Sequence, residues 1–277
     1  MSLKNYSLLP FYDSPTKQHR AIWYSFERIF PMPVLEGMIP PFQWDKFDGI
    51  GDTITKFELK HIMSGTLFDI TSAMSAAGLV ISSETGFDKI TFDGLTRIDN
   101  PDGLNIVDGR AIFENGDYEV KFQVGLNRYT SETFRFVSDI DCFLKIEWWH
   151  DENFEYPGAY IKYDTGFKNF AYFNTEFAKP SYPVQRQVSE RQGRVYPRIQ
   201  TVGKTHRCDI LVPEWLADVL SIVPLHHYVT ITYEGITYDV NQILTAGPEW
   251  LDRGDLGTME LEVTFDNSVV KTGKAKL

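Results

Sequence analysis

The chain has 277 residues, of which 43% are hydrophobic and 14% aromatic, and its formal net charge is −11. This length suffices for one large or two ordinary domains, and the hydrophobic content excludes a compositionally disordered chain. The acidic balance argues against a general nucleic-acid-binding surface, because such surfaces are basic.

Strands are predicted along most of the first half, where apolar and polar residues alternate. These alternating runs cover residues 52–62, 88–95, 109–125 and 131–137. Within residues 109–125, Asn115-Gly116 lies between two alternating runs and predicts a β-hairpin turn. Residues 69–79 have helical spacing instead, with an Ala-rich middle and Gly78 near the end, so we expect a short helix there.

The second half has the same period of two. Its alternating runs cover residues 142–149, 159–177, 207–212, 227–244 and 256–265. Glu234-Gly235 predicts a second hairpin turn. Residues 213–223 begin with proline and place Leu216, Val219 and Leu220 on one face, which predicts a short helix packed on a sheet.

These elements predict a mainly β protein with two β-sandwich-like domains and one or two short helices. The boundary is expected near residue 139, giving an N-terminal β domain at 1–139 and a C-terminal β domain at 140–277, with its helix at 213–223. Residues 7–20 and 37–44 are rich in proline and aromatic residues and have little strand or helix pattern. We therefore expect them to form extended arms that lie on a neighbouring subunit.

Charge is unevenly distributed in two stretches. Residues 179–198 are polar, rich in proline and arginine, and long for a loop, which predicts an irregular functional or interfacial segment. The wider stretch 186–207 has one acidic residue, Glu190, and six basic residues. The basic residues are Arg186, Arg191, Arg194, Arg198, Lys204 and Arg207. Residues 84–119 are mostly acidic among their charged positions. These stretches are either two solvated surfaces or complementary patches for head-to-tail self-association.

Trp148 and Trp149 end an apolar strand and are followed by an acidic stretch. One interpretation is a sugar-stacking platform beside a catalytic Glu147, with Asp151 or Glu152 as the second carboxylate. The other is structural, because adjacent strand residues point to opposite faces. Acidic residues are frequent in this chain, so the carboxylate pairing is unspecific, and we expect one tryptophan to fill the core.

The histidines and aspartates do not form a recognisable metal motif. His226 and His227 are adjacent, and neighbouring strand residues face apart. His150 and His206 lie outside any HxH or HExxH pattern. The aspartates of residues 99–108 lack the ligand spacing of an EF-hand. We therefore expect no metal site.

Neither the cysteines nor a search for common catalytic and phosphate-binding motifs indicates an enzyme. Cys142 and Cys208 lie in alternating apolar runs without a CxxC or Cys/His metal spacing, so both are predicted to be small buried core residues. The chain contains no GxSxG, P-loop or GxGxxG motif. The prediction is a protein with no cofactor and no catalytic residue.

The first residues lack the long apolar core of a signal peptide, and no segment approaches the length of a membrane span. We expect the protein to be made in a cytoplasm, with no membrane span. If it leaves the cell, it is expected to leave as part of an assembly or by lysis.

Several stretches together resemble a known group of sequences. They are SLLPFYDSPTKQHR, IPPFQW, FLKIEWW, YDTGFKNFAYFNTEFAKPSYP, VPEWLADVLSIV and the closing GPEWLDRGDLGTMELEVTFDNSVVK. Their order, from Ser7 to Lys271, is similar to that in hypothetical structural proteins of phages and prophages of Bacteroides-type gut bacteria. The resemblance implies a virion component of the tail or baseplate class and assigns no catalytic residue.

The leading hypothesis is a non-enzymatic phage or prophage structural protein that self-assembles and contacts other virion or tail proteins. The alternative is a carbohydrate-binding module in which Trp148, Tyr156, Tyr160 and Tyr163 stack on a surface glycan. A glycoside hydrolase using Glu147 is the third hypothesis. The candidate interface or ligand residues are Trp148, Trp149, Tyr156, Tyr160, Arg186, Arg191, Arg194 and Arg198.

Overall fold

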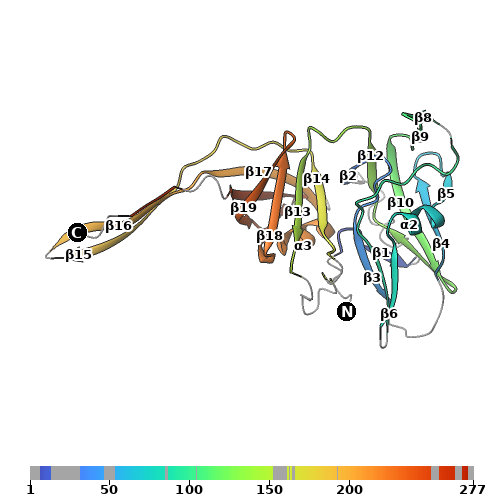
Figure 1. Ribbon diagram of the computed structural model, residues 1–277, viewed down its shortest axis with the longest axis horizontal. Coiled ribbons are helices and arrows are strands. Elements are labelled where there is room, and N and C mark those ends of the chain that lie inside the picture. The colour runs from blue at the N-terminus through green and yellow to red at the C-terminus, as the bar shows by residue number, and fades with distance from the viewer. Residues whose placement is uncertain are drawn as a thin grey trace.

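The protein is mainly β, as the sequence predicts, with two short α-helices among the described residues. The computed structural model describes residues 7–13, 32–46, 54–84, 87–103, 105–151, 161, 163, 166–191, 193–250, 256–265 and 270–273. Two sheet-containing bodies, one N-terminal and one C-terminal, lie side by side. A narrow arm, built from residues 184–191, 194–202 and 270–273, extends from the C-terminal body (Figure 1).

The first sheet is built around β10, a long strand with partners on both edges. Its strands are β1 (Phe11–Asp13), β11 (Asn127–Ser131), β10 (Gly116–Val124), β12 (Phe134–Val137), β2 (Met32–Leu35), β4 (Ile54–His61) and β5 (Leu67–Asp69). β4 pairs along one edge of β10, so β11 and β12 must share the other edge. Where that edge passes from β11 to β12, the Ser131 hydroxyl accepts the Val120 N–H at 2.9 Å. This side chain replaces the missing ladder bond.

A smaller sheet packs against the first and makes the N-terminal body a sandwich. It consists of β3 (Phe42–Lys46), β7 (Phe87–Phe92) and β6 (Val80–Glu84). Edge-to-face aromatic contacts join the two sheets: Phe42 meets Phe11 at 4.8 Å, and Trp44 meets Phe122 at 5.0 Å between ring centroids. The predicted helix at 69–79 is shorter than expected, α2 (Thr71–Ala76), and buries Met74.

The Asn115-Gly116 hairpin prediction is wrong. The segment before it forms β9 (Arg110–Ala111), which pairs with β8 (Ile106–Val107) and not with β10. Gly116 instead begins β10, and the tight turn comes at the other end of that strand, where Val124 pairs with Asn127. The Asn115 amide donates to the Ser138 hydroxyl at 3.5 Å. Contacts with distant segments therefore outweigh the local turn preference.

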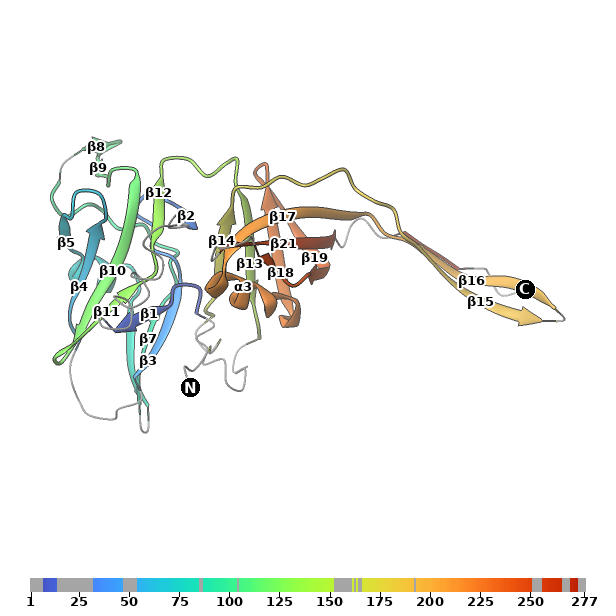
Figure 2. The same ribbon diagram turned by 180° about the vertical axis from the view of Figure 1, so that it is seen from behind.

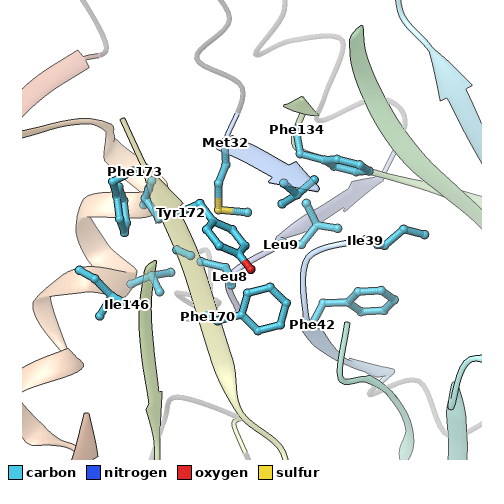
Figure 3. Packing of buried hydrophobic residues seen from close by; sticks show 14 of the residues in the cluster. Leu8, Leu9, Met32, Ile39, Phe42, Phe134, Ile146, Phe170, Tyr172 and Phe173 are labelled. Carbon is cyan, nitrogen blue, oxygen red and sulfur yellow. The ribbon is translucent and has the colours of Figure 1, made fainter. Parts of the chain in front are cut away.

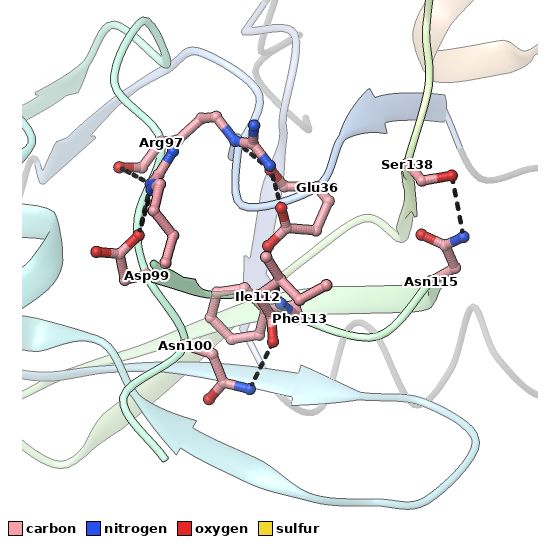
Figure 4. Close-up of polar contacts among 9 residues, drawn as sticks. Glu36, Arg97, Asp99, Asn100, Ile112, Phe113, Asn115 and Ser138 are labelled. Carbon is pink, nitrogen blue, oxygen red and sulfur yellow. Dashed lines mark hydrogen bonds and ion pairs between the residues drawn. The ribbon is translucent and has the colours of Figure 1, made fainter. Parts of the chain in front are cut away.

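An ion pair with a buried carboxylate fixes the loop that precedes β10 (Figure 4). Glu36, directly after β2, is 5% exposed, and its carboxylate pairs with Arg97 and accepts the Phe113 N–H at 2.8 Å. Arg97 Nε also donates to the Glu36 carbonyl at 2.8 Å. A charge this deeply buried is stable only with such partners, so the network pins the loop to β2.

The second body contains one seven-stranded sheet. Its strands are β14 (Asn169–Phe173), β13 (Leu144–Trp149), β18 (Tyr228–Tyr233), β19 (Ile236–Thr245), β21 (Leu256–Phe265), β17 (Thr205–Pro213) and β20 (Glu249–Trp250). The predicted Glu234-Gly235 hairpin is confirmed between β18 and β19, with positive φ at both turn residues. The predicted helix at 213–223 is confirmed as α3 (Glu214–Ser221), followed by the 3₁₀ turn η1 (Val223–Leu225).

The two bodies share one continuous hydrophobic core (Figure 3). The change of sheet falls between β12 and β13, close to the predicted boundary, but buried side chains from both sides belong to one cluster. Leu8 and Leu9 are 0% and 1% exposed and lie within it. Ile39 and Phe42 are also fully buried. The described parts of the predicted extended arms, residues 7–13 and 37–44, therefore pack into this chain itself, because their apolar side chains complete its core.

The arm arises where the sequence predicted an irregular segment. Residues 179–198 contribute to β15 (Val184–Arg191) and β16 (Arg194–Val202), which pair antiparallel along their whole length, and β22 (Val270–Gly273) adds to β16. Both views show this three-stranded ribbon leading away from the two bodies (Figures 1 and 2). Pro197 lies beside a β-bulge, a position where a residue without an N–H is tolerated. The irregular-segment prediction is therefore wrong.

One of the two cysteine predictions is wrong. Cys208 is 4% exposed, as expected, and burial raises the pKa of its thiol to about 12. Cys142 is exposed in the turn between β12 and β13.

Within the part of the chain that the structure describes, every helix is too short or too polar to cross a membrane.

Candidate functional site

The two tryptophans face opposite sides of β13. Trp148 is 0% exposed and shares its face with buried Leu144 and Ile146. Its indole Nε1 has no hydrogen-bond partner among the described residues. The expectation that one tryptophan fills the core is confirmed. Trp148 as an exposed sugar-stacking ring is a wrong prediction, because its ring lies wholly within the core.

Trp149 lies on the other face and is half-buried. Its ring stacks on Tyr228, with centroids 5.4 Å apart and an interplanar angle of 14°. The Lys168 ammonium lies 3.9 Å from the Trp149 ring centroid, a cation–π distance. Two side chains therefore already occupy the surface that a stacking sugar would need.

The tyrosines of the sugar-binding alternative are divided. Tyr156 and Tyr160 lie outside the described residues. Tyr163 is 0% exposed, and its hydroxyl is 2.6 Å from His226 Nε2. The prediction of an exposed Tyr163 is wrong, because its hydroxyl has a buried partner. Burial lowers the pKa of His226 to about 4, so this imidazole is neutral near pH 7.

Glu147 is held by two lysines. Its carboxylate lies 2.6 Å from Lys145 Nζ and 3.4 Å from Lys168 Nζ. The general acid of a glycosidase lies in apolar surroundings, whereas this carboxylate has two ion-pair partners. The arrangement fits an ion-pair network on the face of the sheet that also carries Trp149.

The predicted basic residues are distributed over two different structures. Arg186 and Arg191 belong to β15, and Arg194 and Arg198 belong to β16, so these four lie in the arm. Arg191 and Arg194 are opposite each other in the backbone register of β15 and β16, at the tip of the arm. Arg207 lies on β17 and forms ion pairs with Glu262 and Glu260 of β21, at 2.6 and 3.6 Å. These ion pairs lie within its own sheet, so Arg207 is separate from the basic residues of the arm.

The structure also brings together residues that the sequence treats separately. The side chains of His150, Asp151 and His227 place one ligand-capable atom each within 4.8 Å of one another. His227 Nδ1 lies 3.0 Å from Asp151 Oδ2, and the His150 and His227 rings are 3.9 Å apart. Residues 150 and 227 are distant in sequence, so only the pairing of β13 with β18 could reveal this cluster.

Comparisons with known protein families, with curated proteins and with solved structures find no match.

Proposed function

We propose that this protein is a non-enzymatic structural subunit of a phage or prophage particle, of the tail or baseplate class, that assembles with copies of itself through its arm. The observation that supports this most is the three-stranded arm of β15, β16 and β22, which leads away from both bodies (Figures 1 and 2). A thin ribbon has too few layers to bury its own faces. A neighbouring molecule would cover them.

The strand edges of the arm support the same proposal. Among the described residues, β15 and β22 each pair with β16 and with no other strand. An eight-residue strand such as β15 with one open edge invites pairing with another chain, which natural proteins otherwise suppress. Edge pairing supplies main-chain hydrogen bonds between subunits, and such contacts build assemblies without any chemistry.

Charge supports a head-to-tail arrangement. The strands and turn of residues 184–202 carry four arginines and one glutamate, a formal charge of 4 − 1 = +3, in a chain whose net charge is −11. At the opposite end of the molecule, the loop around β8 and β9 exposes Asp102, Asp108 and Glu114 (Figure 1). A basic arm meeting an acidic end of the next copy is a heterologous contact, which closes into a ring or continues as a filament.

The test is the native mass of the purified chain, measured by light scattering after size exclusion at low and high salt. We expect an oligomer at low salt that dissociates at high salt, because screening weakens exposed charge contacts. In the arm-tip variant Arg191→Gln/Arg194→Gln, dissociation should occur at a lower salt concentration.

The matched control is Arg128→Gln/Arg135→Gln, which removes two exposed arginines from the N-terminal body. It leaves the charge of the arm intact, so it should dissociate at no lower salt concentration than the unaltered chain. A monomer at every salt and protein concentration, or equal weakening by the two double variants, would contradict assembly through the arm.

A further inference from the structure

His150 and His227 are brought together by the register of two strands. β13 and β18 run antiparallel, with Trp149 opposite Tyr228. One step beyond this pair, the residue after Trp149 faces the residue before Tyr228. These two residues are His150 and His227, and their rings lie 3.9 Å apart between centroids. Side chains directly opposite in an antiparallel pair share one face of the sheet, so both imidazoles point to the same side.

Asp151 adds a carboxylate to this histidine pair. Its Oδ2 is 3.0 Å from His227 Nδ1. The Tyr228 hydroxyl also lies near this carboxylate. A carboxylate beside two imidazoles is a ligand set of the kind that binds Zn²⁺.

We propose that His150, Asp151 and His227 form a binding site for a divalent transition-metal ion of the Zn²⁺ type, with water completing the coordination. The site uses two imidazole nitrogens and one carboxylate oxygen, and an open fourth position is usual for zinc with three protein ligands.

The geometry needs only a small adjustment to accept the ion. The three ligand atoms lie within 4.8 Å of one another. In tetrahedral zinc, with bonds of about 2.0–2.1 Å, ligand atoms are roughly 3.3 Å apart. The side chains of Asp151 and His227 are 58% and 60% exposed, so they have room to rotate inward. His150 is 5% exposed and supplies the fixed ligand.

The hydrogen bond at His150 Nδ1 determines what a bound metal ion must replace. His150 Nδ1 accepts the Asp151 backbone N–H at 3.0 Å. A metal that binds through Nδ1 replaces this hydrogen bond, and one that binds through Nε2 requires the ring proton to leave that nitrogen. A proton that leaves Nε2 moves to Nδ1, which also breaks this hydrogen bond, so either mode of binding costs one contact. We therefore expect weaker affinity than in a preformed structural zinc site.

The direct test is calorimetric titration of the full chain with Zn²⁺, after removal of any affinity tag and treatment with EDTA. We expect one saturable site per chain. Asp151→Asn and His227→Gln should each raise the dissociation constant at least about ten-fold, because each removes a ligand. Both side chains are exposed, so the variants should fold, and their melting temperatures in EDTA check this.

Matched controls are Asp141→Asn and His61→Gln, which remove an exposed carboxylate and a histidine outside the cluster. They should bind Zn²⁺ like the unaltered chain. Tyr228→Phe keeps the ring beside Trp149 and removes only the hydroxyl near Asp151, so it should weaken binding less than Asp151→Asn. Absence of saturable binding, or equal affinity in the cluster variants and the controls, would overturn the proposal.

Discussion

The segment at residues 7–13 is buried but pairs as a strand over a short length, whereas the arm at residues 184–202 pairs over a long length and leaves the core. The first pairs over three residues in β1, yet Leu8 and Leu9 are almost completely buried. The second pairs over eight residues on each strand and leads away from the core (Figure 2). Backbone pairing and core packing are therefore separate properties of a segment, because the first satisfies N–H and C=O groups and the second requires apolar side chains.

The largest expected effect tests burial within a single strand. Trp148→Ala should lower the free energy of unfolding by about 3–5 kcal/mol, because it empties a large core position. Trp149→Ala should cost about 1 kcal/mol, since that ring is half-buried and loses mainly its Lys168 and Tyr228 contacts. Urea unfolding followed by circular dichroism measures both. Equal losses would mean that the opposite orientation of the two rings is wrong.

The next effect compares the two regions directly. Leu9→Ala should lower the free energy of unfolding by about 2–5 kcal/mol, because Leu9 belongs to the core that both bodies share. Val184→Ala, at the base of the arm with 51% of Val184 exposed, should change it by less than about 0.5 kcal/mol. Thermal or chemical unfolding of the two variants provides the comparison. A small loss for Leu9→Ala would remove the N-terminal segment from the core.

The smallest effect is a difference in chemical reactivity between a buried and an exposed cysteine, and no residue is substituted. Thiol reagents attack the thiolate. Burial raises the pKa of Cys208 to about 12, whereas Cys142 is exposed. Iodoacetamide at pH 8 should therefore add one label to the folded chain and two labels in denaturant, as read by intact mass. Two labels on the folded chain, with unfolding excluded by circular dichroism, would contradict the burial of Cys208.

The local patterns predicted the conformation of many segments. The period of two located most strands, the spacing of Leu216, Val219 and Leu220 located α3, and Glu234-Gly235 located its hairpin. These signals depend on residues a few positions apart. The arm was missed because its strands carry arginine, glutamine and proline, and the alternation of apolar residues is weak there.

Strand pairing was the main property that local patterns could not supply. Asn115-Gly116 favours a turn, yet β10 finds its partners elsewhere, in β4, β11 and β12. The cluster of His150, Asp151 and His227 has the same origin, since His150 and His227 meet only through the register of β13 with β18. Which of the two tryptophans is buried likewise depends on which face of that sheet meets the core.

The residue pattern alone predicted a mainly β chain with one or two short helices, an acidic balance and a basic stretch, because composition and short-range periodicity carry that information. The fold was needed to show that residues 7–13 belong to the core, that residues 184–202 form an arm, and that two histidines and an aspartate meet. Burial and side-chain proximity depend on contacts between residues far apart in the chain, which local patterns do not encode.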